Sequence, residues 1–342
     1  MGMTETELKT CIKARNCSVY VLHGAENYLT QQYARHIADQ TVDADFAVFN
    51  LHWLDGQSLS FDELETAVDA LPMMGERTCV LVRDLDVAAA DAQRLSALVQ
   101  GAPAHCVLVF WQITVQPDKR KAWKDFLQLV TQRGGAVVNF ERNTVDEAAK
   151  RLVSGAKRRG CSLSPEDARY MVEQTGSDLH LLLGELEKFV ALAQDGVITR
   201  EIINAAGAKN LETRVFDLSK AILQQRTQQA YTLLHQLFVQ REEPVAVLGV
   251  LSTAYADLYR AKVAVLSGQP AESVANAFKS YKNKEFRLRN AARDARKMSV
   301  EALRDCLAIL ARSDAALKTG RADGRILLEQ TVTQLIQRAQ EG

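Results

Sequence analysis

The 342-residue sequence is poor in residues that interrupt helices, with only 6 prolines and 18 glycines. A sandwich of many short strands needs frequent turns, so this scarcity favours long helices. No run approaches the roughly 18 apolar residues of a membrane span. The opening stretch, MGMTETELKT, also has no apolar segment typical of an export signal. We therefore expect a helix-rich cytoplasmic protein that does not associate with membranes.

The six cysteines are scattered without a CxxC pair and without a histidine at ligand spacing. Metal sites and disulfide frameworks usually show regular spacings, so we expect neither zinc nor disulfides. The formal net charge is zero, from 42 basic and 42 acidic residues, which indicates neither a nucleic-acid binder nor an acidic tail.

One segment departs from this balance. Residues 278–297 hold 8 basic and 2 acidic residues, with Tyr281 and Phe286 among them. This mixture is compatible with phosphate contacts and base stacking, and equally with a solvated helix face. The candidate DNA-proximal basic face is Lys279, Lys282, Lys284, Arg287, Arg289 and Arg293.

The first part of the chain alternates short apolar runs with helical stretches. The runs cover residues 18–24, 47–53, 78–82, 106–111 and 136–140. Such alternation predicts a mainly parallel sheet with helices on both faces. After Phe140 the sequence predicts only helices. We expect an α/β domain over 1–142, a small helical domain over 143–210 and a larger helical domain over 211–342.

An ATPase with this opening should carry GxxxxGK[ST] after its first strand, because phosphate needs backbone amides and a lysine. The chain has HGAENYLTQ there, which keeps Gly24 but places Glu26 where phosphate would lie. Asp84 and Asp86 follow a later strand, as magnesium ligands do, but turn and cap residues fit them better. We predict no catalytic site, no metal site and no cofactor.

Residues 69–77, DALPMMGER, place Leu71, Met73 and Met74 around a proline between a predicted helix and a strand. Two interpretations stay open. The apolar side chains either pack beneath the sheet edge or form a protruding wedge that fills a partner's pocket. Methionine suits an adaptable contact of the second kind.

Four segments in this order resemble the delta subunit of the bacterial DNA polymerase III clamp loader. They are YVLHGAENYLTQQYARHI, LPMMGERTCVLVRDLD, ETRVFDLSKAI and LKTGRADGRILLEQ. The resemblance implies a degenerate AAA+ domain that binds no ATP, a helical lid and a helical collar. It also implies membership of the polymerase holoenzyme, a nucleotidyltransferase complex, without catalysis by the chain itself.

The resemblance further implies that the chain opens the ring-shaped sliding clamp (beta), whose binding residues here are Leu71, Met73 and Met74. The pair Met73-Met74 departs from the family's usual Leu-Phe or Phe-Phe. The resemblance also implies that the helical collar contacts the ATPase subunits (gamma/tau) and delta prime, and that primed DNA lies nearby. The alternatives are an AAA+ ATPase with an atypical phosphate loop and a helical scaffold unrelated to replication.

Overall fold

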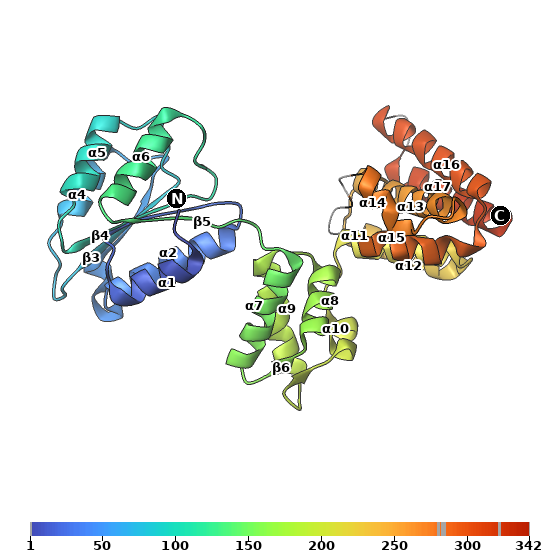
Figure 1. The fold of residues 1–342 in the computed structure, drawn as a ribbon, viewed down its shortest axis with the longest axis horizontal. Helices are drawn as coiled ribbons and strands as arrows, with labels where there is room; N and C mark the ends of the chain where they lie inside the picture. Colours follow the sequence, from blue (N-terminus) through green and yellow to red (C-terminus); the bar gives the residue numbers. More distant parts are fainter. Residues whose placement is uncertain (1, 279–280, 282–284, 321–322, 342) are drawn as a thin grey trace. The chain divides into compact units, whose positions relative to one another are not determined.

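The computed structural model describes residues 2–278, 281, 285–320 and 323–341 (Figure 1). The chain divides into two compact units. The N-terminal unit comprises Met1–Val172 and Ser177–Thr199, and the C-terminal unit comprises Glu173–Gly176 and Arg200–Gly342. The division into three domains at residues 142 and 210 stays a prediction.

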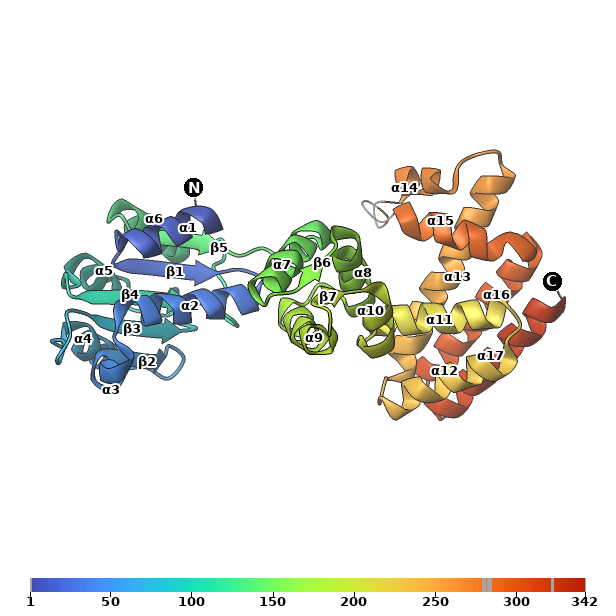
Figure 2. The same cartoon turned by 90° about the horizontal axis from the view of Figure 1, so that it is seen from below.

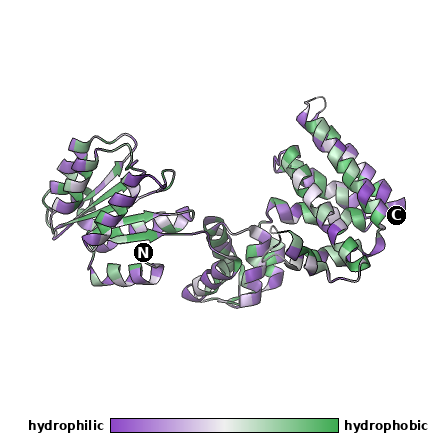
Figure 3. Ribbon diagram, turned by 45° about the horizontal axis from the view of Figure 1, so that its top comes forward, coloured by the Kyte–Doolittle hydropathy of each residue, from purple (hydrophilic) through white to green (hydrophobic). Residues whose placement is uncertain are grey.

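The N-terminal unit contains a five-stranded sheet in which every neighbouring pair is parallel. The strand order is β2-β3-β4-β1-β5. Its strands are β1 (Val19–His23), β2 (Leu51–Asp55), β3 (Thr78–Arg83), β4 (Cys106–Trp111) and β5 (Ala136–Asn139). The central strands are almost wholly buried, as their unbroken apolar runs predict. Figure 3 shows the same strands as the hydrophobic centre of this unit.

Helices cover both faces of the sheet, which confirms the predicted architecture. One face carries α1 (Glu5–Ala14) and α2 (Asn27–Thr41). The opposite face carries α4 (Phe61–Asp69), α5 (Ala92–Gly101) and α6 (Lys121–Gln132) (Figure 1). The core beneath this second face includes Trp123 and Phe126 of α6 packed against Phe110 of β4.

Three local expectations were wrong. The chain opens with α1 rather than a strand, because Leu8, Cys11 and Ile12 make a buried helical stripe among charged residues. The strand expected over 47–53 starts later than predicted, because a short helix α3 (Ala47–Asn50), preceded by the 3-10 turn η1 (Ala44–Phe46), comes before β2 (Leu51–Asp55). Two-residue strands β6 (Ser162–Leu163) and β7 (Val197–Ile198) pair in parallel, too short to leave a sequence pattern.

The expectation that the chain has no disulfide was also wrong. Cys11 of α1 is joined to Cys17, six residues later, with their Cα atoms 6.3 Å apart. Arg15, in the left-handed region with φ of 53°, ends α1 and reverses the chain so that the two thiols meet. The other four cysteines are free and buried.

The remaining helices of the middle segment are α7 (Val145–Arg158), α8 (Pro165–Thr175), α9 (Leu179–Leu192) and α10 (Arg200–Ala206). Helix α7 begins with a capping box, in which Thr144 and Glu147 bind each other's backbone amides. Helices α7 and α9 pack together within the N-terminal unit, and α10 lies in the C-terminal unit.

The C-terminal unit is helical throughout its described residues. Its longer helices are α11 (Leu211–Leu223), α12 (Thr227–Val239), α13 (Pro244–Leu266), α15 (Glu285–Asp294), α16 (Val300–Lys318) and α17 (Gly324–Glu341). Its shorter helical segments include η2 (Ala271–Ser273), α14 (Val274–Ala277) and η4 (Ala295–Lys297). The apolar faces of α13 and α16 meet in one core, for example through Tyr255 and Leu303. Within the described part of the chain, no helix is long and apolar enough to cross a membrane.

A chain of polar contacts ties α1, α2 and α7 together in the N-terminal unit. The Tyr33 hydroxyl donates to Glu5 at 2.7 Å, and Arg151 forms an ion pair with the same carboxylate. Arg151 also donates to Asn143 at 2.8 Å, and Asn143 donates to Glu26 at 3.2 Å. Burial alone would raise the pKa of Glu5, but its bonds from Arg151, Tyr33 and Lys9 prevail and lower that pKa to about 2.

We expect Glu5→Gln to destabilise the protein at pH 7 by about 1 to 3 kcal/mol, because Arg151 loses its charged partner. Since the pKa of Glu5 falls from 4.5 to about 2 on folding, the stabilisation is fully present above pH 4.5. It decreases as the pH falls toward 2. Urea unfolding of both proteins at pH 7 and pH 3 measures this, and an equal difference at both pH values would contradict it.

Candidate functional site

The loop between α4 and β3, residues 70–77, exposes three large apolar side chains. The exposed fractions are 76% for Leu71, 54% for Met73 and 78% for Met74. We call residues 70–77 the apolar loop. Packing beneath the sheet edge is therefore wrong for these side chains. A contiguous exposed apolar surface of this kind is typical of a protein contact.

Polar bonds hold the apolar loop at three points. The Asn50 side chain accepts from the Met73 amide at 2.7 Å and donates to the Met73 carbonyl at 2.8 Å. The His105 ring Nε2 bonds the Ala70 carbonyl at 3.2 Å, and the His105 carbonyl accepts from the Thr78 amide at 2.9 Å. The loop is thus fixed near its start, its middle and its end.

The backbone of the apolar loop is also in an unusual conformation at Met74. Met74 has a φ of 51°, in the left-handed region that ordinary side chains seldom adopt. Holding a methionine there costs free energy, and such residues concentrate at functional sites. Met74 takes this conformation although it is not a glycine, and its side chain is 78% exposed.

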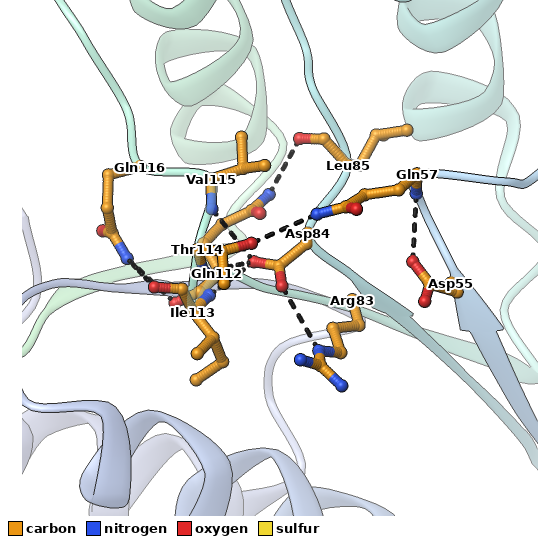
Figure 4. A network of polar contacts seen from close by, with 10 residues as sticks. All are labelled: Asp55, Gln57, Arg83, Asp84, Leu85, Gln112, Ile113, Thr114, Val115 and Gln116. Carbon is orange, nitrogen blue, oxygen red and sulfur yellow. Dashed lines mark hydrogen bonds and ion pairs between the residues drawn. The ribbon is translucent and has the colours of Figure 1, made fainter.

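The carboxyl ends of the parallel strands are where this class of sheet binds nucleotides. In this chain the first backbone amide after β1 already has a partner, because the Gly24 amide donates to Gln116 Oε1 at 2.9 Å. Gln116 is in turn held by the carbonyls of Gln112 and Ile113, both at 3.2 Å (Figure 4). Two residues further on, the Glu26 amide donates to the Phe140 carbonyl at 2.9 Å.

The position expected to oppose phosphate does carry a carboxyl group. Glu26 is buried at the start of α2 and accepts a hydrogen bond from Asn143. Burial raises the pKa of Glu26, and the bond from Asn143 opposes that shift only in part. At the carboxyl ends of the strands, protein side chains therefore take the place that free backbone amides and a lysine hold in a phosphate-binding site.

Asp84 organises the neighbouring strand ends, as Figure 4 shows. Its buried carboxylate accepts from the backbone amides of Ile113 at 2.6 Å, Thr114 at 2.8 Å and Val115 at 3.2 Å. Burial would raise the pKa of Asp84, but these amide bonds outweigh it and lower the pKa. Asp86 accepts from the Ala88 amide. Asp86 is therefore a turn residue, as expected, whereas Asp84 bonds a separate segment of the chain and not its own turn.

We expect Asp84→Asn to cost about 1.5 to 3 kcal/mol of stability at pH 7, since the three amides lose a charged acceptor and Arg83 loses its ionic partner. The folded protein lowers the pKa of Asp84 below 3.8, so its contribution is present above that pH and is lost as the pH falls through the folded value. Unfolding at pH 7 and near pH 2.5 measures the difference. A cost that does not shrink at low pH would contradict this account.

The structure describes only part of the candidate basic face. Lys279, Lys282 and Lys284 lie outside the described residues. Arg287 pairs with the buried carboxylate of Asp257 at 2.9 Å, so it fixes α15 to α13. Arg289 and Arg293 are mostly exposed, with longer contacts of 3.6 Å to Glu272 and 3.5 Å to Asp294.

Tyr281, an aromatic residue of the same segment, is buried. Its hydroxyl donates to Asp257 at 2.6 Å and accepts from Arg260 at 2.7 Å. The Arg260 guanidinium also lies 4.3 Å from the centre of the Phe278 ring. Tyr281 thus anchors this segment to α13, and its ring is not presented for stacking on a base.

Sequence reasoning missed Asn50, His105 and Gln116, the residues that hold the apolar loop and fill the strand-end edge. Asn50 did leave a signal, because a lone amide within the apolar run AVFNLHW requires hydrogen-bond partners once buried. Nothing in the sequence pairs His105 or Gln116 with its partner, since these contacts join distant segments.

Together these features define the class of protein. It is an AAA+-like parallel α/β unit, with a strand-end edge filled by its own side chains, followed by a helical unit. Comparison with known proteins agrees. The family model "DNA polymerase III, delta subunit" matches residues 20–132, and "DNA polymerase III delta subunit, C-terminal domain" matches residues 212–335.

Two relatives match along nearly the whole chain. DNA polymerase III subunit delta of Bacillus subtilis is 25% identical over 330 residues, covering 94% of this chain and 93% of the relative. The probable DNA polymerase III subunit delta of Aquifex aeolicus is 23% identical over 337 residues, covering 94% and 91%. The solved structure of the Bacillus subtilis DNA clamp loader delta protein has a TM-score of 0.58 at 23% identity, covering 97% and 99%.

The chain therefore belongs to the family of DNA polymerase III delta subunits, which confirms the resemblance seen in the sequence. As a member of this family, it belongs to the DNA polymerase III complex as a delta subunit.

Proposed function

We propose that this chain binds the ring-shaped sliding clamp through Leu71, Met73 and Met74 and holds one clamp interface open for loading onto primed DNA. The observation that carries the proposal is the apolar loop, which exposes three large apolar side chains on an anchored backbone. In a clamp-loader protein, such a surface suits a pocket on another protein of the assembly.

The energy for opening comes from differential binding. Burial of each large apolar side chain in a pocket contributes about 1.5 to 3 kcal/mol before the costs of association. Only the part of this free energy that favours the open clamp over the closed clamp shifts the equilibrium. The loop is held in place beforehand, so little of the binding energy is spent on ordering it.

In this proposal the chain works without catalysis of its own. The Gly24 amide and the Glu26 carboxyl are already bound within the protein, which supports a strand-end edge that takes no nucleotide. ATP acts on other subunits, gamma/tau, and residues 211–342 join the chain to them and to delta prime. Arg289 and Arg293 remain the described candidates for the side near primed DNA.

We expect the double substitution Met73→Ala and Met74→Ala to weaken binding to the sliding clamp of the same cell by at least about 100-fold, from the apolar area removed. Both side chains are exposed, so the thermal midpoint should change by less than about 2 °C. Calorimetric titration without ATP, alongside thermal unfolding, measures both quantities.

The matched control for this pair is Leu192→Ala, which truncates another exposed apolar residue, 48% exposed, at the end of α9. The control should bind the clamp as the unchanged protein does. Unchanged affinity of the double variant would overturn the assignment of the loop, and no binding by the folded unchanged protein would overturn the proposed function itself.

We expect titration with ATP and Mg²⁺ to give no saturable binding to the isolated chain, because the amides and charge that cradle phosphate are missing or already bonded. Equilibrium dialysis with labelled ATP measures this directly. Saturable binding in the micromolar range would instead favour an ATPase with an atypical phosphate loop. A variant such as Gln116→Ala, which frees the Gly24 amide, serves as the sensitive comparison.

A further inference from the structure

A second exposed apolar segment lies beside the apolar loop. Val48 and Phe49 of α3 are 88% and 50% exposed, whereas the next residue, Asn50, is 1% exposed. Figure 2 shows α3 and α4 at the β2 edge of the sheet. Within the described part of the chain, packing covers little of Val48, so its side chain faces solvent or a partner.

Asn50 joins the two segments directly. Its side-chain amide bonds both backbone groups of Met73, at 2.7 and 2.8 Å, from the end of the helix that carries Val48 and Phe49. Gly75 also lies close to the Asn50 side chain, because a Cβ atom added to Gly75 would be 3.1 Å from Asn50 Nδ2. The position of Met73 relative to Phe49 is therefore set by one buried side chain.

We propose that Val48 and Phe49 extend the clamp-binding surface beyond the apolar loop, and that Asn50 is the positioning residue that holds the two parts in register. This inference rests on the proposed function. The surface is then bipartite, with Leu71, Met73 and Met74 in the loop and Val48 and Phe49 on α3.

Charge favours a protein occupant over nucleic acid. Residues 43–50 and 69–77 together hold four acidic residues, Asp43, Asp45, Asp69 and Glu76, and one basic residue, Arg77. All four acidic residues are exposed. An acidic border repels phosphate, so the surface suits an apolar pocket with basic surroundings on the clamp. Continuity with the loop makes the clamp the occupant of both segments.

The first test substitutes the α3 part alone. We expect Val48→Ser with Phe49→Ala to weaken clamp binding about tenfold, less than the Met73 and Met74 pair. The control Leu192→Ser should bind normally. If the α3 variant binds as tightly as the unchanged protein while the methionine variant does not, the extension is overturned and the proposed function stands. If the unchanged protein does not bind, both are overturned.

The second test addresses the positioning role. Asn50→Ala removes both bonds to Met73, and Asn50→Asp keeps an acceptor for the Met73 amide but loses the donor to its carbonyl. We expect clamp affinity to fall about tenfold for Ala and by a smaller factor for Asp. Amide hydrogen exchange of residues 70–77 in the free protein should rise in the same order.

That local exchange distinguishes positioning from general destabilisation, which would raise exchange throughout the sheet as well. Faster exchange confined to residues 70–77, together with weaker binding, supports the positioning role. Unchanged affinity with faster loop exchange would overturn it, as would weaker binding with unchanged loop exchange. If Asn50→Ala does not fold, Asn50→Asp carries the same comparison.

Discussion

An apolar loop that faces solvent gains nothing from burial, so its shape has to be held by polar bonds made elsewhere. In this chain Asn50 supplies the central pair of bonds, to the amide and carbonyl of Met73. His105 fixes the start and end of the same loop. The exposed side chains can then meet a partner without first being ordered, and the left-handed conformation of Met74 is maintained by its neighbours.

The same unit shows how the protein's own groups can fill the strand-end edge of a nucleotide-type sheet while the fold is kept. Strand order and parallel pairing are intact. At the strand ends, however, the Gly24 amide bonds Gln116, and the Asp84 carboxylate bonds three amides of the segment after β4. These bonds satisfy groups that phosphate or magnesium would otherwise engage. They also stiffen the carboxyl ends of the strands, so the sheet remains a rigid support for the loop.

The sequence predicted the sheet, its helical cover and the later helices, because unbroken apolar runs and 3.6-residue stripes report burial directly. It also singled out Leu71, Met73 and Met74, since two methionines beside a proline are unusual in a loop. It misplaced the start of β2, because exposed Val48 and Phe49 look like strand residues in an apolar run. The partners of Asn50, His105 and Gln116 lie in separate segments, which no local pattern reports, and the Cys11–Cys17 disulfide depends on the sharp chain reversal at Arg15.

The central claim is that this chain meets the sliding clamp with one defined surface of its N-terminal unit. Hydrogen exchange of the whole chain, measured free and with saturating clamp, tests it most directly, because protection maps the contact without any substitution. The account predicts new protection in residues 47–50 and 70–77, with little change over residues 211–342. Protection confined to the helices of the C-terminal unit, with the apolar loop unchanged, would contradict it.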